Sequence, residues 1–252
     1  MKTIGLIGGM SWESSREYYR IINETVREKL GDPHSCKTIL YSVDFAEIES
    51  LQHRGEWKKL TDRMIVIAKI LEQAGAELLV VCTNTMHTMA DDIQKNIKIP
   101  LVHIADTVAE EIIKRNMHTV GLLGTRFTME HDFYKGRLKE IHGIDVLVPE
   151  KPERDIVHTI IYKELVAGII NEDSREKFKA IMGNLQKSGA EGVILGCTEI
   201  PLLIRAEESD LPVFDTTMLH ARKAVELALD YGPPKRTVFT NHGYVNNKVS
   251  KK

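Results

Sequence analysis

The stretch Ala74–Thr85, AGAELLVVCTNT, decides the fold, because it recurs at Ser188–Glu199 as SGAEGVILGCTE. Both copies contain an apolar run of strand length that ends in small polar residues. Successive side chains on a strand point to opposite faces, so Cys82 and Thr83 cannot both line one pocket unless the strand has already ended. The stretch therefore raises the question of which of these two residues faces a site.

Two further segments repeat in the same order along the chain. They pair KTIGLIGG at Lys2–Gly9 with HTVGLLGT at His118–Thr125, and IPLV at Ile99–Val102 with LPVF at Leu211–Phe214. Three ungapped matches at nearly constant spacing indicate that one structural unit has been duplicated. We therefore expect two related lobes.

The sequence predicts an α/β fold with parallel sheets, because apolar runs of strand length alternate with segments of helical periodicity. In the first half the strands are Thr3–Ile7, Lys37–Val43 and Leu78–Cys82, and the helices are Trp12–Leu30, Trp57–Gln73 and Met86–Lys95. In the second half the strands are Thr119–Leu123, Asp145–Val148, Gly192–Gly196 and Val213–Asp215. We expect lobe 1 to comprise residues 1–105 and 216–231, lobe 2 residues 106–215, and a polar tail, 232–252, to lie outside the core.

Composition points to small-molecule partners. The 252 residues include 34 Lys and Arg against 36 Asp and Glu, a net charge of -2 that gives no general attraction to nucleic acid or to a membrane. No apolar run is as long as a membrane span, and the apolar part of the N-terminus is too short for a signal peptide. We therefore expect a cytoplasmic protein.

The cysteines and histidines give no metal or disulfide pattern. Cys36, Cys82 and Cys197 are widely spaced, with no CxxC, and the ten histidines are scattered without metal-ligand spacing. This pattern requires no metal and no disulfide framework.

The repeat answers the question about Cys82 and Thr83. Alignment of the two copies places Thr83 opposite Cys197, whereas Cys82 falls opposite Gly196. In open parallel sheets, ligands bind beyond the carboxyl ends of the strands, where Thr83 and Cys197 are the first polar residues. If the lobes face one another, this pair lies across a cleft. Cys82 then packs in the core, as free cysteines commonly do.

Five motifs, in order, carry a resemblance to a known family: GLIGGMSWESSREYYRIIN, CTNTMH, LLGTRFTM, GCTEIPLL and LPVFDTTMLHA. Over Lys2–Leu229 the chain resembles the aspartate/glutamate racemase superfamily, in the branch of aspartate/glutamate or broad-specificity amino-acid racemases. The resemblance implies two pseudo-symmetric α/β lobes with the active site between them, no pyridoxal phosphate, no metal, and a homodimer. It also implies a cysteine on each side of the substrate's α-carbon. The first of these cysteines directly precedes Asn-Thr in the family, and here Thr83 stands there.

Racemisation requires two acid/base groups, because the α-proton leaves one face of the carbon and a proton returns to the other. A free thiol has a pKa of ~8.5, and a position at a helix N-terminus lowers this pKa. We expect the segment after Cys197 to begin a helix that favours its thiolate. An alcohol is a far weaker acid, so Thr83 either passes a proton from a water or a neighbouring group, or only binds the substrate's carboxylate.

The other candidate residues supply partners for the ends of an amino acid. The α-carboxylate and ammonium would meet Asn84, Thr85, Thr198 and Glu199 and, by resemblance, the backbone amides of Met10, Ser11 and Thr125. Arg54 and Lys163 stand at similar places in the two halves and resemble side-chain-recognition positions of acidic-amino-acid racemases. Gln52 is a neutral candidate in the loop of Arg54. Most Arg and Lys are surface charges, which is the alternative for both cations.

The sequence therefore predicts cofactor-independent racemisation of aspartate or glutamate. One alternative is a one-cysteine relative such as a malonate-type decarboxylase, which the carboxylate of Glu199 disfavours. The other is a protein that binds acidic amino acids without catalysis. The preference between aspartate, glutamate and a broader set of substrates stays open.

Overall fold

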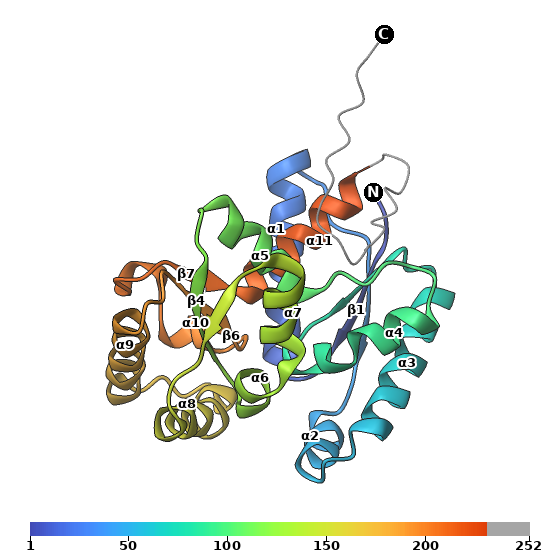
Figure 1. The fold of residues 1–252 in the computed structure, drawn as a ribbon. Helices are drawn as coiled ribbons and strands as arrows, with labels where there is room; N and C mark the ends of the chain where they lie inside the picture. Colours follow the sequence, from blue (N-terminus) through green and yellow to red (C-terminus); the bar gives the residue numbers. More distant parts are fainter. Residues whose placement is uncertain (231–252) are drawn as a thin grey trace.

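The computed structural model describes residues 1–230, so the predicted tail, 232–252, lies outside the described residues. The chain forms two parallel sheets, each with helices on both faces (Figure 1). The first sheet has strand order β2-β1-β3, and the second has the order β5-β4-β6-β7. The predicted α/β class with two related lobes is confirmed.

The two sheets repeat one arrangement. The strands of the first are β1 (Ile4–Gly8), β2 (Thr38–Ser42) and β3 (Leu78–Val81), and those of the second are β4 (Thr119–Gly124), β5 (Asp145–Leu147), β6 (Val193–Gly196) and β7 (Val213–Asp215). In the second sheet, Val193 pairs with Val213. The first sheet has an isolated bridge between Leu79 and Leu101, which the sequence repeat aligns with that pair. The duplication thus extends to strand order and register.

Apolar side chains cover both faces of each sheet. In the first lobe, α3 (Trp57–Gln73) and α4 (Ala90–Asn96) pack on one face, and α1 (Trp12–Leu30) and α11 (Thr216–Leu229) on the other. In the second lobe, α8 (Lys151–Lys163) and α9 (Glu172–Lys187) pack on one face, and α5 (Ile104–Lys114) and α7 (Asp132–His142) on the other. The remaining short elements are α2 (Phe45–His53), α6 (Arg126–Glu130), α10 (Ile200–Leu203) and the 3-10 helices η1 (Thr85–Met89), η2 (Leu165–Ala167) and η3 (Ala206–Glu208).

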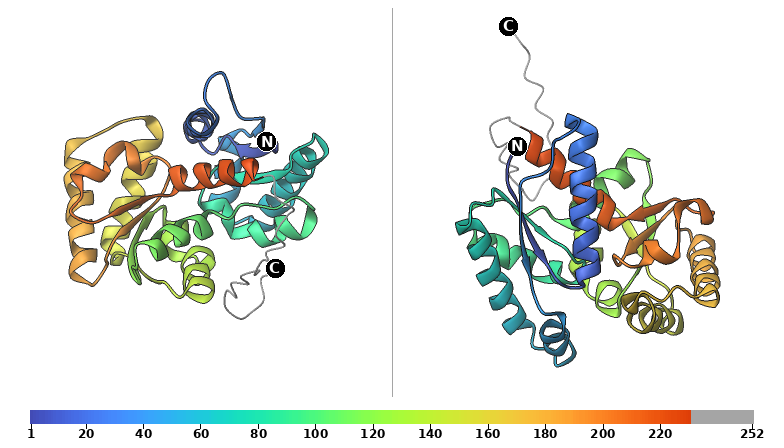
Figure 2. Two further views of the ribbon diagram at one scale, coloured as in Figure 1. Left: turned by 90° about the horizontal axis from the view of Figure 1, so that it is seen from above. Right: turned by 180° about the vertical axis from the view of Figure 1, so that it is seen from behind.

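Helix α11 connects the lobes. It lies beside α1 and α5 and also contacts strands of both sheets, and Figure 2 shows it reaching from one lobe to the other. The amide of Lys2 donates a hydrogen bond to the carbonyl oxygen of Ala228, near the end of α11. The last described helix therefore fixes the start of the chain.

Helix bounds follow local signals where those signals are strong. Helix α1 has its predicted bounds, because the Ser11 side chain accepts a hydrogen bond from the amide of Ser14 and Gly31, at φ 84°, ends the helix. Helix α3 also has its predicted bounds. The helix predicted at Met86–Lys95 is instead η1 followed by α4, and α2 was not predicted. None of the described helices is long and apolar enough to cross a membrane.

Candidate active site

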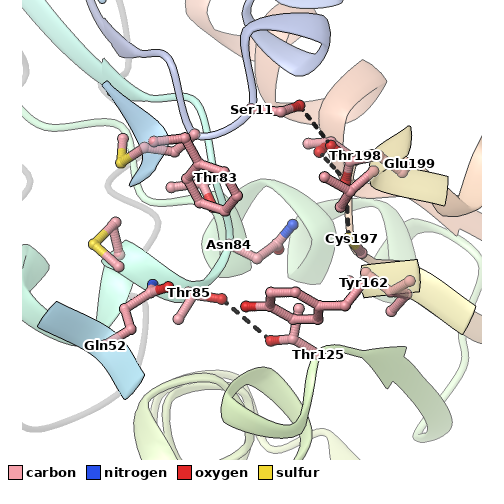
Figure 3. Close-up of a pocket in the computed structure, with 16 residues that line it drawn as sticks. Ser11, Gln52, Thr83, Asn84, Thr85, Thr125, Tyr162, Cys197, Thr198 and Glu199 are labelled. Atoms are coloured by element: carbon pink, nitrogen blue, oxygen red, sulfur yellow. Dashed lines mark hydrogen bonds between the residues drawn. The ribbon is translucent and has the colours of Figure 1, made fainter. Parts of the chain in front are cut away.

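A pocket lies where the carboxyl ends of both sheets meet (Figure 3). Its lining comprises Met10, Ser11, Phe45, Gln52, Thr83, Asn84, Thr85, Met86, Thr125, Ile161, Tyr162, Val166, Gly196, Cys197, Thr198 and Glu199. All the candidate site residues of the sequence are present except Arg54 and Lys163. The pocket therefore draws on segments from both halves of the repeat.

Thr83 reaches this pocket because β3 ends just before it. The amide of Cys82 still donates to the sheet, at the carbonyl of Ile7, but the amide of Thr83 turns back to the carbonyl of Val81 at 2.9 Å. The Thr83 hydroxyl makes no hydrogen bond with any residue of the described range, so it faces the pocket unpaired. Figure 3 shows Thr83 on the β3 side of the pocket and Cys197 on the opposite, β6 side.

Cys82 lies on the other side of its strand. It is fully buried in a cluster with Tyr18, Ile22 and residues of α11, and it is absent from the pocket lining. Burial raises the pKa of its thiol far above the ordinary value. The expectation that Cys82 packs in the core is confirmed.

Glu199 is the centre of a hydrogen-bond network beside Cys197. Its Oε2 accepts hydrogen bonds from Cys197 Sγ at 2.9 Å and from Thr198 Oγ1 at 2.7 Å. Its Oε1 accepts one from Ser11 Oγ at 2.8 Å. Ser11 belongs to the loop after β1, so this carboxylate joins the two lobes at the pocket.

The environment of Cys197 favours the neutral thiol. Burial, and then the negative charge of Glu199, raise the pKa of the Cys197 thiol well above its usual range, while the amides of Thr198 and Glu199 act in the opposite direction. Helix α10 follows but has only four residues. The two backbone amides act in the expected direction, but burial and the adjacent carboxylate outweigh them, so the neutral thiol is favoured.

The wall between Thr83 and the second lobe is polar. Asn84 donates from Nδ2 to the hydroxyl of Thr216 at 3.1 Å, while its buried Oδ1 has no partner in the described chain. The hydroxyl oxygens of Thr85 and Thr125 are 3.3 Å apart, and both lie near that of Thr128. Thr125 also caps α6 by accepting from the amide of Thr128. These groups offer hydrogen bonds of either polarity to a ligand.

Gln52 enters the pocket on α2, the helix that was not predicted. Only 6% of the residue is exposed, and its Oε1 has no hydrogen-bond partner within residues 1–230. Asp44 starts α2 by accepting a hydrogen bond from the amide of Ala46. A buried acceptor without a partner is unfavourable, so Oε1 of Gln52 is available to a ligand donor.

The structure does not bring Arg54 and Lys163 into the pocket. Arg54 follows α2, and its guanidinium donates to Glu56 Oε1 at 2.7 Å and to Ser50 Oγ at 3.0 Å on the surface. Lys163 ends α8 with an exposed side chain. Within the described lining, Glu199 is the one charged residue. The two predicted partners for a distal carboxylate thus lie outside this cavity.

Tyr162 is the main pocket residue that the sequence reasoning missed. It precedes Lys163 on α8, and burial, followed by the charges of Cys197, Glu49 and Glu199, raises the pKa of its hydroxyl. Phe45, Met86, Ile161, Val166 and Gly196 complete the unpredicted lining. The helical periodicity of the apolar residues of α8 is the sequence signal that could have located Tyr162.

Among residues 1–230, no group of three or more His, Cys, Asp or Glu side chains is placed to hold a metal ion.

Comparisons with known proteins identify the family and the fold. The family model for Asp/Glu/Hydantoin racemase matches residues 7–224. A candidate Asp/Glu racemase from Yersinia pestis is 52% identical, with a TM-score of 0.86 over 91% of this chain and 100% of that one. An aspartate racemase homologue from Pyrococcus horikoshii is 41% identical, with a TM-score of 0.80 over 90% of this chain and 99% of that one.

A more distant curated relative has a wider substrate range in its name. The broad specificity amino-acid racemase of Bacillus subtilis is 22% identical over 90% of this chain and 99% of its own length. Because the family model spans both sheets and the pocket between them, the chain belongs to the Asp/Glu/Hydantoin racemase family.

Proposed function

We propose that this protein racemises aspartate or glutamate without a cofactor, with Cys197 and Thr83 acting on opposite faces of the α-carbon. The observation that carries the proposal is the placement of these two residues in one pocket, each within two residues of the end of the equivalent strand of its lobe. A glutamate racemase and an aspartate racemase homologue among the relatives support acidic substrates.

Cys197 is the base for the L enantiomer, a role that the family resemblance implies. Glu199 Oε2 lies 2.9 Å from the sulfur, so a substrate ammonium at this carboxylate would offset the charge that raises the thiol pKa. Binding of an amino acid thus favours loss of the thiol proton to solvent. The thiolate then removes the α-proton and becomes a neutral thiol again.

Thr83 delivers a proton to the other face of the resulting carbanion. Its hydroxyl has no partner in the described chain and is free to turn toward the substrate. After donation, the oxygen recovers a proton from solvent, which balances the proton that the Cys197 thiol released to solvent. Because an alcohol is a much weaker acid than a thiol, this half-reaction is the slower one.

The distal carboxylate of the substrate would accept hydrogen bonds from Gln52 and Tyr162. This assignment replaces Arg54 and Lys163, because Gln52 and Tyr162 line the pocket and the two cations do not. Neutral donors discriminate less strongly than a buried cation does. We therefore expect acidic substrates to be preferred over neutral ones by a modest factor.

The deciding experiment follows L-aspartate and L-glutamate by chiral chromatography, with chelator present, no pyridoxal phosphate, and thiols kept reduced. We expect both enantiomers to appear with the native enzyme and none of the D form with Cys197→Ser. Binding of the amino acid without conversion would instead identify a non-catalytic binding protein. Loss of activity on exhaustive chelation would exclude the cofactor-independent mechanism.

The predicted homodimer and cytoplasmic location remain part of this proposal. Light scattering coupled to size-exclusion chromatography tests the dimer, and fractionation of the source cells tests the location.

A further inference from the structure

The position of the Thr83 hydroxyl depends on its backbone. The side chain has no hydrogen bond within the described chain, and β3 has ended, so the sheet does not fix it. The amide of Thr83 is bonded to the carbonyl of Val81. Its own carbonyl oxygen lies 2.8 Å from Nδ1 of His87. The hydrogen bond with His87 therefore attaches the Thr83 backbone to a residue outside β3.

The geometry fixes the tautomer of His87. A carbonyl oxygen only accepts, so Nδ1 carries the proton and donates it to Thr83. Burial lowers the pKa of His87 to about 4, and the imidazole is therefore neutral at neutral pH. Its Nε2 is then an acceptor, and it is buried without a partner in the described chain. Reversing the tautomer would place two acceptors against each other.

Neighbouring rings hold the imidazole in place. The ring of His103, at the start of α5, has its centroid 4.8 Å away, and that of His220, on α11, is 5.5 Å away. His220 is itself fixed, since Nδ1 accepts from the hydroxyl of Tyr18 and Nε2 donates to the carbonyl of Val102, both at 2.8 Å. Residues of α1, α5 and α11 thus support the ring that anchors Thr83.

We propose that His87 is the positioning residue for Thr83: its Nδ1–H bond holds the end of β3 so that the hydroxyl meets one face of the substrate. This inference rests on the proposed racemase function and extends it to a residue outside the pocket lining. Cys197 belongs to the other lobe, and its thiol bonds to Glu199 rather than to the end of β3. Loss of the His87 bond should therefore affect only the half-reaction on the Thr83 side.

The test separates the two half-reactions in deuterium oxide. For an L substrate, loss of the α-hydrogen reports removal by Cys197, and appearance of the D form reports delivery on the Thr83 side. In His87→Leu we expect inversion to slow by about ten- to a hundredfold, the range for a misplaced catalytic group. Exchange from the L substrate should change by less than about twofold, since it does not require Thr83.

Rescue distinguishes a donated hydrogen bond from mere packing. His87→Asn places an amide donor near the position of Nδ1 and should restore most of the inversion rate. His87→Gln has a similar polarity but places its amide near Nε2, so it should behave as the leucine variant does. The matched control is His34→Leu. This histidine is exposed and distant in sequence from His87, so the variant should leave both rates unchanged.

Nitrogen-15 spectra of labelled histidine give a readout that needs no activity. The signal that disappears in His87→Asn should be that of a neutral imidazole with the proton on Nδ1, and a proton on Nε2 would overturn the inference. Equal slowing of exchange and inversion in His87→Leu, or equal behaviour of the Asn and Gln variants, would also overturn it. A wild-type protein with neither exchange nor inversion would instead remove the proposed function. Should the leucine variant not fold, the Asn and Gln pair still decides.

Discussion

The hydroxyl of Ser11, from the first lobe, donates a hydrogen bond to the carboxylate of Glu199, from the second lobe, over 2.8 Å. The same carboxylate accepts from the thiol of Cys197. The two lobes are therefore coupled through the carboxylate beside the proposed base, Ser11 at Oε1 and Cys197 at Oε2. Charge-assisted hydrogen bonds of this kind are stronger than neutral ones.

Ser11→Ala should lower turnover by about tenfold, because a hydrogen bond to a charged group is worth roughly 1.5–3 kcal/mol and part of this is recovered by water. It should also lower the free energy of unfolding by about 1 kcal/mol, since Ser11 caps α1. Steady-state kinetics and urea unfolding measure the two effects. The control is Asn171→Ala, which removes the cap of α9 away from the pocket. Equal loss of activity in that variant would mean that Ser11 acts through stability alone.

Glu199→Gln should lower the pKa of the Cys197 thiol, because the negative charge that raises it is removed. Alkylation by iodoacetamide, followed against pH, should therefore reach its half-maximal rate at a lower pH than in the native protein. Cys197→Ser identifies the labelled residue. Turnover should nevertheless fall, since the substrate ammonium loses its partner. An unchanged alkylation profile would show that burial alone sets the thiol pKa.

Cys82→Ala should keep most of the activity, whereas Cys197→Ser should abolish it, because only Cys197 lines the pocket. Cys82 is fully buried, so its truncation should lower the free energy of unfolding by about 1 kcal/mol. Turnover and urea unfolding of both variants test this. Comparable losses of turnover would contradict the assignment of the two cysteines.

Gln52→Leu should weaken kcat/KM for aspartate and glutamate more than for alanine, since the NH2 group of this buried side chain is a proposed donor to the distal carboxylate. A difference of about tenfold corresponds to one hydrogen bond to a charged group. Arg54→Ala is the matched control, because it alters the adjacent exposed cation and should change neither value. A selective loss of kcat/KM for acidic substrates in Arg54→Ala would restore Arg54 as the partner of the distal carboxylate.

Acid should destabilise the fold through three buried histidines. Burial lowers the pKa of His87 to about 4 and of His220 to about 3, and it lowers that of His103 as well. In the unfolded chain, histidine titrates near ~6.5. Below that pH the unfolded state binds protons that the folded state does not, so stability falls as the pH decreases. Each histidine contributes up to about 1.4 kcal/mol per pH unit.

Urea unfolding between pH 7 and pH 5.5 measures this slope above most of the carboxylate range. In His220→Gln the change in the free energy of unfolding per pH unit should decrease by the contribution of one histidine. A free energy of unfolding that does not change over this interval would show that the three rings are protonated in the folded state.

Local signals in the sequence determined the sheets. The repeated apolar runs specified two related parallel sheets, and the alignment of the two copies separated Cys82 from Thr83. Strong caps likewise specified α1, whereas the segment after Thr85 gave a helical period without showing that its first turn is a 3-10 helix. These features depend on neighbours in the chain, which is why the sequence alone sufficed for them.

The rest of the site was decided only by tertiary packing. Tyr162 lines the pocket and Lys163 does not, because the contacts of α8 with the second sheet set the rotation of this helix. Gln52 lines the pocket in place of Arg54, because Gln52 lies on the buried side of α2, a helix that was not predicted. The direction of the Cys197 pKa likewise follows from burial and from a carboxylate whose charge the buried surroundings do not screen. Helix rotation and burial sum many contacts between distant segments, and no local sequence pattern encodes that sum.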